Sequence, residues 1–364
     1  MEDQQHMTQR KRTVKGVLGI ALLLPAITVK PAPAETLAFA LIGDMPYTSP
    51  TLPDAVTRYQ RLITDVNNSY KKVKFTIHIG DIKAGTTRCD DDVYLSNKTL
   101  FNTFADAAIY LPGDNEWTDC HRINNGSFNP LERLNFLRST FYTSNLSLGG
   151  KPITLTRQAG YPENVMWTAA QVLFVGINMP GSNNNHQQAY QGLVPCAPAI
   201  PYPCTFNEDE YTARNAANRL WLNQAFDIAA DPANGIKGVL IAAQANPFER
   251  FVESGFGYTE SGYADFMSLV RTRTLLLGKP VVYVNGDTHY FRIDRPMTGA
   301  YPACAGGISN PCVPVAAPTS PTDRVHSFTR VEVFGQNDVH WVRGFIDTDD
   351  PKIFTFAPQT VPMN

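Results

Sequence analysis

The sequence predicts an α/β fold in which a mostly parallel sheet is covered by helices, with an antiparallel hairpin near the carboxyl end. Three observations predict it. Short apolar runs typical of buried strands recur along the chain, segments with helical spacing lie between them, and four of the runs end in Gly-Asp. The 364 residues are enough for one large domain of this class.

The four Gly-Asp strands supply the framework of the predicted sheet. They span residues 37–46, 75–83, 107–117 and 280–291. Glycine lets the backbone turn sharply at the carboxyl end of a strand. The next residue then points into the crevice where parallel sheets bind ligands. A single Gly-Asp is also typical of a solvated turn, whereas four at the same point of a strand favour a shared site.

The remaining elements follow from hydrophobic spacing. Helices are expected from Val56 to Val66 and over 131–141, 213–228 and 266–277, and strands over 172–178 and 238–244. Near the end, residues 328–335 and 339–347 alternate around a Gln-Asn-Asp turn. This alternation predicts that the two segments pair with each other as a hairpin.

The chain opens with the pattern of a secretory signal peptide. Basic residues between positions 10 and 15 precede an apolar run over 17–29, and Ala32 and Ala34 mark a cleavage site. The run is short for a bilayer span, and an uncleaved anchor is the alternative. We expect residues 1–34 to be removed, 35–350 to form the domain and 351–364 to form a tail. The protein would then be secreted or periplasmic.

Composition limits the partners. The net charge of −2 and the lack of a basic stripe argue against a general nucleic-acid binder. No stretch after the leader is apolar enough to predict a membrane span.

The six cysteines are consistent with an oxidising compartment. A zinc site built from these cysteines is disfavoured, because the chain has no Cys-x-x-Cys pair. Spacing suggests two local pairs that close Pro-rich loops, Cys196 with Cys204 and Cys304 with Cys312. The remaining Cys89 and Cys120 each follow a Gly-Asp turn, so a bridge between them would join two loops of the site. Six cysteines allow several connectivities, and the pairing stays open at this point.

The Gly-Asp motifs and one histidine define a candidate metal site. Asp44, Asp81, Asp114 and Asp287 each follow the glycine, and His289 lies two residues after the last of them. If the strands belong to one sheet, these side chains meet at its carboxyl edge. Carboxylates held so close repel one another unless a cation lies between them. The sequence therefore predicts a site for a divalent cation.

The order of these motifs resembles that of the calcineurin-like metallophosphoesterases, over roughly residues 37–347. The family runs Asp-x-His, Gly-Asp-x-x-Asp, Gly-Asn-His-Glu/Asp, a lone His after a strand, and Gly-His-x-His. The counterparts are Gly-Asp-Met-Pro at 43–46, Gly-Asp-Ile-Lys at 80–83, Gly-Asp-Asn-Glu at 113–116, Gln244, and Gly-Asp-Thr-His at 286–289. The resemblance implies a sandwich of mostly parallel sheets flanked by helices, and a metal-dependent hydrolase of small phosphoesters.

The resemblance also implies which residues hold metal. Asp81 would bridge two ions, Asp44 and His289 would hold one of them, and the second would take Asp114, Gln244 and Asp287. Four of the five family histidines are replaced here, so one or two ions are expected. The oxygen-rich set suits Mg²⁺, Mn²⁺ or Ca²⁺ more than Zn²⁺. The alternative is a non-catalytic binding protein that keeps the fold.

Three residues near the motifs are candidates for binding the substrate's phosphate or for donating a proton to its leaving group. Asn115 stands where the family has its catalytic histidine, and it can hydrogen-bond phosphate without donating a proton at neutral pH. His121 is a candidate replacement, with a surface histidine as the alternative. Lys83 is a candidate phosphate contact, with a solvated or salt-bridged loop lysine as the alternative.

Other residues near the motifs are assigned less specifically. Tyr47, Trp117 and Tyr290 follow site motifs and are expected either to wall the pocket or to pack in the core. His78 lies within a strand and is interpreted as a core or supporting group. The polar segment 182–186 could touch substrate, although a plain surface loop is the simpler interpretation.

Overall fold

The structure, a computed structural model, describes residues 35–48, 53–186, 208–248, 261–297, 324–336 and 338–362. The expected signal peptide and the cysteines Cys196, Cys204, Cys304 and Cys312 lie outside the described residues. The described residues belong to one compact unit. In the part of the chain that is described, no helix combines the length and the apolar character needed to cross a membrane.

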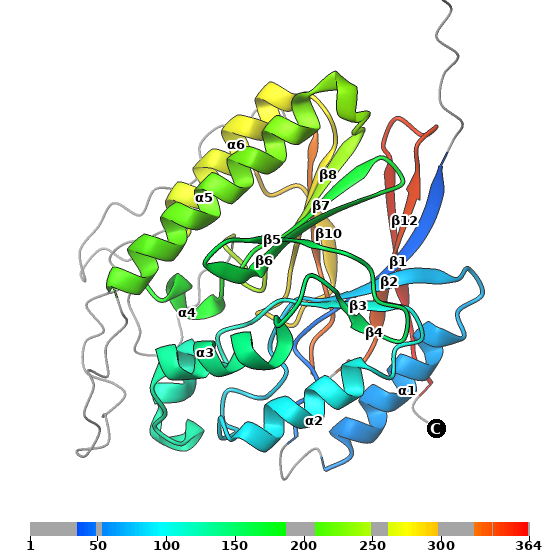
Figure 1. Ribbon diagram of the computed structural model, residues 1–364. Coiled ribbons are helices and arrows are strands. Elements are labelled where there is room, and N and C mark those ends of the chain that lie inside the picture. The colour runs from blue at the N-terminus through cyan, green and yellow to red at the C-terminus, as the bar shows by residue number, and fades with distance from the viewer. Residues whose placement is uncertain are drawn as a thin grey trace, which may run out of the picture. The chain divides into compact units, whose positions relative to one another are not determined.

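Two β-sheets form the framework (Figure 1). The first has six strands in the order β13-β12-β1-β2-β3-β4, and the second has seven in the order β10-β11-β9-β8-β7-β6-β5. The strands of the first sheet are β1 (Thr36–Ile42), β2 (Val73–His78), β3 (Ala107–Tyr110), β4 (Leu148–Gly149), β12 (Trp341–Asp347) and β13 (Phe354–Gln359). Those of the second are β5 (Thr156–Gln158), β6 (Tyr161–Ala169), β7 (Val172–Gly176), β8 (Gly238–Ala242), β9 (Val281–Asn285), β10 (Arg292–Asp294) and β11 (Phe328–Glu332).

The centre of each sheet is parallel. Strand β1 pairs with β2, and β2 pairs with β3, in parallel register. Strands β7, β8, β9 and β11 form the parallel centre of the second sheet. These strands are short and apolar. Helices join β1 to β2, β2 to β3, β7 to β8 and β8 to β9, as the alternation in the sequence predicted. Antiparallel strands lie at the edges of both sheets.

Period-two alternation decides which core each strand side chain enters. In β1, Phe39 and Leu41 pack into the core between the sheets, whereas Ala40 and Ile42 pack into the core under the helices of the first sheet. Phe174 of β7 meets Phe39 across the sandwich at 5.4 Å between ring centroids. Both faces of the central strands are therefore buried, which explains why the strands read as continuous apolar runs.

Helices cover the outer faces of both sheets. The helices α1 (Ala55–Asn67), α2 (Asp91–Phe101) and α3 (Pro130–Phe141) pack against the first sheet, and α5 (Glu208–Ala230) and α6 (Ala264–Leu277) cover the second. Figure 1 shows α5 and α6 lying side by side. In α1 the buried residues Tyr59, Leu62, Ile63 and Val66 recur at the predicted helical spacing.

Three expectations about connectivity are corrected. The Gly-Asp strands belong to two sheets, because β9 pairs with β8 and β11. Residues 328–335 and 339–347 do not pair with each other: β11 lies in the second sheet and β12 in the first. The antiparallel hairpin at the carboxyl end consists instead of β12 and β13. The segment expected as a tail therefore contributes an edge strand, since alternation alone does not identify a strand's partner.

Candidate metal centre

The site residues follow four parallel strands at their carboxyl ends. Asp44, Asp81 and Asp114 come after β1, β2 and β3, while Asp287 and His289 come after β9 of the other sheet. A hydrogen bond of 2.9 Å from the Asp287 backbone N to the Asp44 side-chain Oδ1 joins the two sets of loops. The site is therefore built across the junction of two sheets.

Four of these residues have left-handed backbone conformations. The φ angles are 53° at Asp44, 58° at Asp81, 74° at Asp287 and 62° at His289. Residues other than glycine rarely adopt this region, although Asp and His do so more often than most. Such backbone strain costs about 1–3 kcal/mol per residue and tends to persist where function requires it.

Asp44, Asp81 and His289 form the group that we call the candidate metal centre. One potential ligand atom from each lies within 4.8 Å of the other two. Ligands of a shared cation lie within about 2.0–2.6 Å of it, so residues held this close could share one ion. Asp44 Oδ2 is fully buried and has no hydrogen-bond partner. A buried carboxylate oxygen without a donor is costly, so the donor set fits a cation at this point.

Two neutral side chains hold the Asp81 carboxylate. The Tyr47 hydroxyl donates to Asp81 Oδ2 at 2.7 Å, and Asn115 Nδ2 donates to the same oxygen at 2.7 Å. The Tyr47 oxygen is also 3.5 Å from His289 Nε2. Tyr47 therefore contacts the candidate ligands Asp81 and His289 directly and does more than line the pocket. The Asn115 amide, expected to contact phosphate, is instead directed to Asp81.

The electrostatics of the group are dominated by buried negative charge. Burial raises the pKa of Asp81 and of Asp287, and the charge of the neighbouring Asp114 raises both further. Burial also raises the pKa of Asp114, with repulsion from Asp119 adding to it. Bound positive charge would relieve this repulsion.

The pKa of His289 is also raised, but here the cause is a neighbouring negative charge and not burial. Burial lowers the pKa of His289, but its hydrogen bond to Asp44 and that residue's negative charge outweigh burial, so the pKa is raised overall. His289 Nε2 lies 3.4 Å from Asp44 Oδ1. The imidazole is therefore drawn to the same carboxylate that presents the unpartnered oxygen.

Asp114, Gln244 and Asp287 form a second, hydrogen-bonded group. Gln244 follows β8 and is fully buried. Its Nε2 lies 3.3 Å from Asp114 Oδ1 and 3.2 Å from Asp287 Oδ1, while its Oε1 accepts a hydrogen bond from Gly181 N. The Gln244 oxygen, expected to ligate a second ion, thus points to a backbone amide and away from the carboxylates.

The segment after β7 closes this second group. It contains the short helical turn α4 (Gly181–Asn184), in which Ser182 and Asn183 have φ angles of 46° and 54°. Ser182 Oγ donates to Asp114 Oδ2 at 2.8 Å and lies 2.9 Å from Asp119 Oδ1. The polar segment 182–186 therefore contacts the site through Ser182. Ser182 and Asp114 are far apart in the sequence, so no local pattern pairs them.

Lys83 and His121 each contact a backbone carbonyl of their own segment. Lys83 is 1% exposed, and its Nζ donates to Ala84 O at 3.1 Å. Burial lowers its pKa to about 8 despite nearby carboxylates. Lys83 is therefore not a solvated loop lysine, and its contact with phosphate stays a prediction. His121 Nδ1 lies 2.7 Å from Thr118 O in its own 3-10 turn, and burial lowers its pKa.

The aromatic residues that follow the motifs separate into different environments. Trp117 is fully buried in the core and stacks with Arg214, whose guanidinium carbon is 5.3 Å from the ring centroid. Tyr290 is 69% exposed. His78 is buried, with Nε2 2.8 Å from Met45 O, as expected for a core or supporting group.

Glu116 is a supporting residue to which the sequence analysis assigned no role. Its Oε1 accepts from Ile82 N at 3.0 Å and from the Tyr110 hydroxyl at 2.9 Å. It therefore ties the loop after β2 to the loop after β3. The signal was present in the sequence, because Glu116 is the acidic last member of the Gly-Asp-Asn-Glu motif.

The predicted bridge between Cys89 and Cys120 is confirmed, with 5.8 Å between the Cα atoms. It joins the segment after β2 to the 3-10 turn after β3. The other two pairs lie outside the described residues, so they stay predictions.

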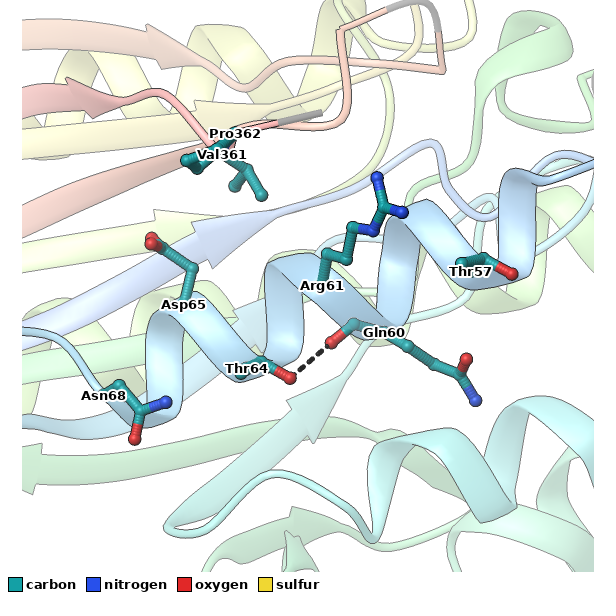
Figure 2. A pocket seen from close by; sticks show the side chains of 8 residues that line it. All are labelled: Thr57, Gln60, Arg61, Thr64, Asp65, Asn68, Val361 and Pro362. Atoms are coloured by element: carbon teal, nitrogen blue, oxygen red, sulfur yellow. Dashed lines mark hydrogen bonds between the residues drawn. The ribbon is translucent and has the colours of Figure 1, made fainter. Parts of the chain in front are cut away.

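A separate groove of about 450 Å³ lies against α1 (Figure 2). It is lined by α1 residues and by Val361 and Pro362. In Figure 2, the Thr64 hydroxyl donates to Gln60 O within the helix, at 2.9 Å. The lining contains no residue of the candidate metal centre.

The chain was compared with known proteins. No family model matches it, and no curated protein matches it. One similar structure is described as a 5'-nucleotidase from Staphylococcus aureus in complex with alpha-ketoglutarate, with 12% identity, a TM-score of 0.45, and coverage of 91% of this chain and 55% of that one.

Two further solved structures are similar. Purple acid phosphatase PPD1 from yellow lupin (Lupinus luteus) has 11% identity and a TM-score of 0.42, covering 90% of this chain and 54% of that one. A 5'-nucleotidase from Candida albicans SC5314 has 9% identity and a TM-score of 0.41, covering 88% and 50%. The chain spans about half the length of each of these structures, and identities this low describe the fold alone.

The arrangement of the sheets and of the motifs agrees with the resemblance seen in the sequence. Two stacked sheets, each with parallel strands at its centre and antiparallel strands toward its edges, carry helices on their outer faces. The motifs follow their strands in the expected order and converge from both sheets. The described residues therefore form the sandwich of two sheets flanked by helices that this resemblance implies.

Proposed function

We propose that the protein is a metal-dependent hydrolase of small phosphoesters, secreted or periplasmic, with Asp44, Asp81 and His289 as the cation ligands. The observation that carries this proposal is the convergence of these three ligand atoms within 4.8 Å, beside the unpartnered buried oxygen Asp44 Oδ2. Mg²⁺, Mn²⁺ or Ca²⁺ suits such a set better than Zn²⁺. A cation bound there would supply Lewis-acid polarisation of a phosphoryl oxygen and lower the pKa of water.

The chain's own groups would orient this chemistry. Tyr47 and Asn115 fix the Asp81 carboxylate through hydrogen bonds of 2.7 Å each. Asp287 N fixes Asp44 at 2.9 Å. Such supporting bonds hold ligands in place before a substrate arrives. The buried positive charge of Lys83 opposes the surplus of carboxylates without reaching the surface.

One observation favours the non-catalytic alternative. In place of the family's catalytic histidine, Asn115 is neutral and hydrogen-bonded to Asp81. An alkyl leaving group needs a proton that Asn115 cannot supply, whereas an aryl leaving group needs little protonation. The proposal therefore expects aryl phosphates or aryl phosphodiesters to be hydrolysed faster than alkyl ones.

The test compares hydrolysis of p-nitrophenyl phosphate and bis-p-nitrophenyl phosphate before and after Mn²⁺ or Mg²⁺ is added to metal-stripped protein. Activity should depend on the metal and fall to background in Asp81→Asn. Asp349→Asn, a substitution at an exposed position, should keep wild-type activity. A protein that binds metal, as judged by a rise in melting temperature, but hydrolyses neither substrate would be the binding protein of the alternative.

A further inference from the structure

The carboxamide of Gln244 occupies the space between two carboxylates. Its Nε2 lies 3.3 Å from Asp114 Oδ1 and 3.2 Å from Asp287 Oδ1. An amide nitrogen carries two protons, so it can donate one to each carboxylate. The orientation of the amide follows from its other end, because Oε1 accepts from Gly181 N. A flipped amide would set its oxygen against two carboxylates.

The remaining carboxylate oxygens of this group also have donors. Ser182 Oγ donates to Asp114 Oδ2 at 2.8 Å, and Asn246 N donates to Asp287 Oδ2 at 3.3 Å. Each oxygen of the two carboxylates therefore has a donor from the chain. Asp44 Oδ2 of the candidate metal centre, by contrast, is buried without one.

The backbone of Gly181 closes the same space from the side of α4. A Cβ atom built on Gly181 would lie 2.6 Å from Asp287 Oδ1 and 2.7 Å from Asp114 Oδ2. The chain thus approaches both carboxylates as closely as a glycine allows. A cation needs several oxygens at about 2.0–2.6 Å, and the position between these carboxylates is already taken by Gln244 Nε2.

We propose that the Gln244 carboxamide replaces a second cation in this protein, so that the folded chain binds one divalent cation and not two. The proposal rests on the proposed function for its first cation only. Two N–H donors stabilise the carboxylates that a second ion would otherwise neutralise, and they do so without any metal. Of the one or two ions that the sequence allowed, this chain's own hydrogen bonds favour one.

The experiment counts metal per chain. Metal-stripped wild-type protein is loaded with Mn²⁺, freed of excess metal, and measured by inductively coupled plasma mass spectrometry, with calorimetric titration as a second count. Gln244→His removes the paired donors and adds a ligand nitrogen. Gln244→Glu removes the donors and adds a carboxylate. Gln60→His, at an exposed position on α1, is the matched control, and circular dichroism melting reports which variants fold.

The expected result is one Mn²⁺ per wild-type chain, one more in a folded Gln244 variant, and the wild-type count in Gln60→His. Two ions per wild-type chain would overturn the inference while leaving the proposed function standing. Folded Gln244 variants that gain no ion over the wild type would also overturn it. A wild-type count of zero would refute the proposed function, and the gain of an ion on substitution would still decide the role of Gln244.

Discussion

His78 makes the stability of this protein depend on pH in a way that can be calculated. The imidazole is buried under the site loops, with Nε2 2.8 Å from Met45 O and Nδ1 accepting from Gly80 N at 3.3 Å. Burial lowers its pKa from 6.5 to about 4, although Met45 O and Asp44 act in the opposite direction. The folded protein therefore holds His78 neutral where the unfolded chain would protonate it.

The magnitude follows from linkage. A base whose pKa is lowered by folding binds fewer protons in the folded state, so its stabilisation is complete above pH 6.5 and is lost as the pH falls toward 4. The difference between 6.5 and about 4 corresponds to about 3 kcal/mol between pH 7 and pH 4, at about 1.4 kcal/mol per pKa unit. This is a large share of the stability of a typical domain.

The assay is urea unfolding of metal-stripped protein at half-unit steps from pH 7 to pH 4, for wild type and His78→Gln. Glutamine can still donate to Met45 O but does not titrate. The free-energy cost of His78→Gln should be largest at pH 7 and should shrink by about 3 kcal/mol by pH 4. Exposed His326 provides the control His326→Gln, whose curve should follow that of the wild type. Parallel curves for wild type and His78→Gln would refute the argument.

Three further predictions concern the site and its frame. In Gly286→Ala the new Cβ would lie 2.1 Å from Asp44 Oδ2, so Mn²⁺ affinity measured by calorimetric titration should fall at least about tenfold; unchanged affinity would exclude Asp44 as a ligand. Replacing both Cys89 and Cys120 by alanine removes a crosslink over a separation of 31 residues and should cost about 3–4 kcal/mol in urea unfolding; a cost below about 1 kcal/mol would contradict the estimate. Because the raised pKa values of the buried site carboxylates make the metal-free protein lose stability as the pH rises through them, Mn²⁺ should raise the melting temperature more at pH 7.5 than at pH 5. An equal or smaller rise at pH 7.5 would show that these carboxylates do not face the cation.

The structure also decides how the Gln244 amide is oriented, which the sequence left open. A glutamine at the place of a ligating histidine offers an oxygen, and the sequence therefore permitted Gln244 as a ligand. The direction of the amide is set by Gly181 N, from a loop more than sixty residues earlier in the chain. No residue near Gln244 in the sequence indicates that Gly181 N is its donor. Lys83 is similar, because it is 1% exposed although it lies in a loop and carries a charged group.

The sequence by itself determined the features that depend on neighbouring residues. Strand periodicity, the Gly-Asp turns and the helical spacing of α1, α3, α5 and α6 are local properties, and all are found where they were expected. The bridge between Cys89 and Cys120 was suggested by the position of each cysteine after a Gly-Asp turn. Only the tertiary structure decided that β9 belongs to a different sheet from β1, and which carboxylates receive donors from the chain. Those outcomes depend on contacts between segments far apart in sequence, and a strand carries the same alternation whichever partner it pairs with.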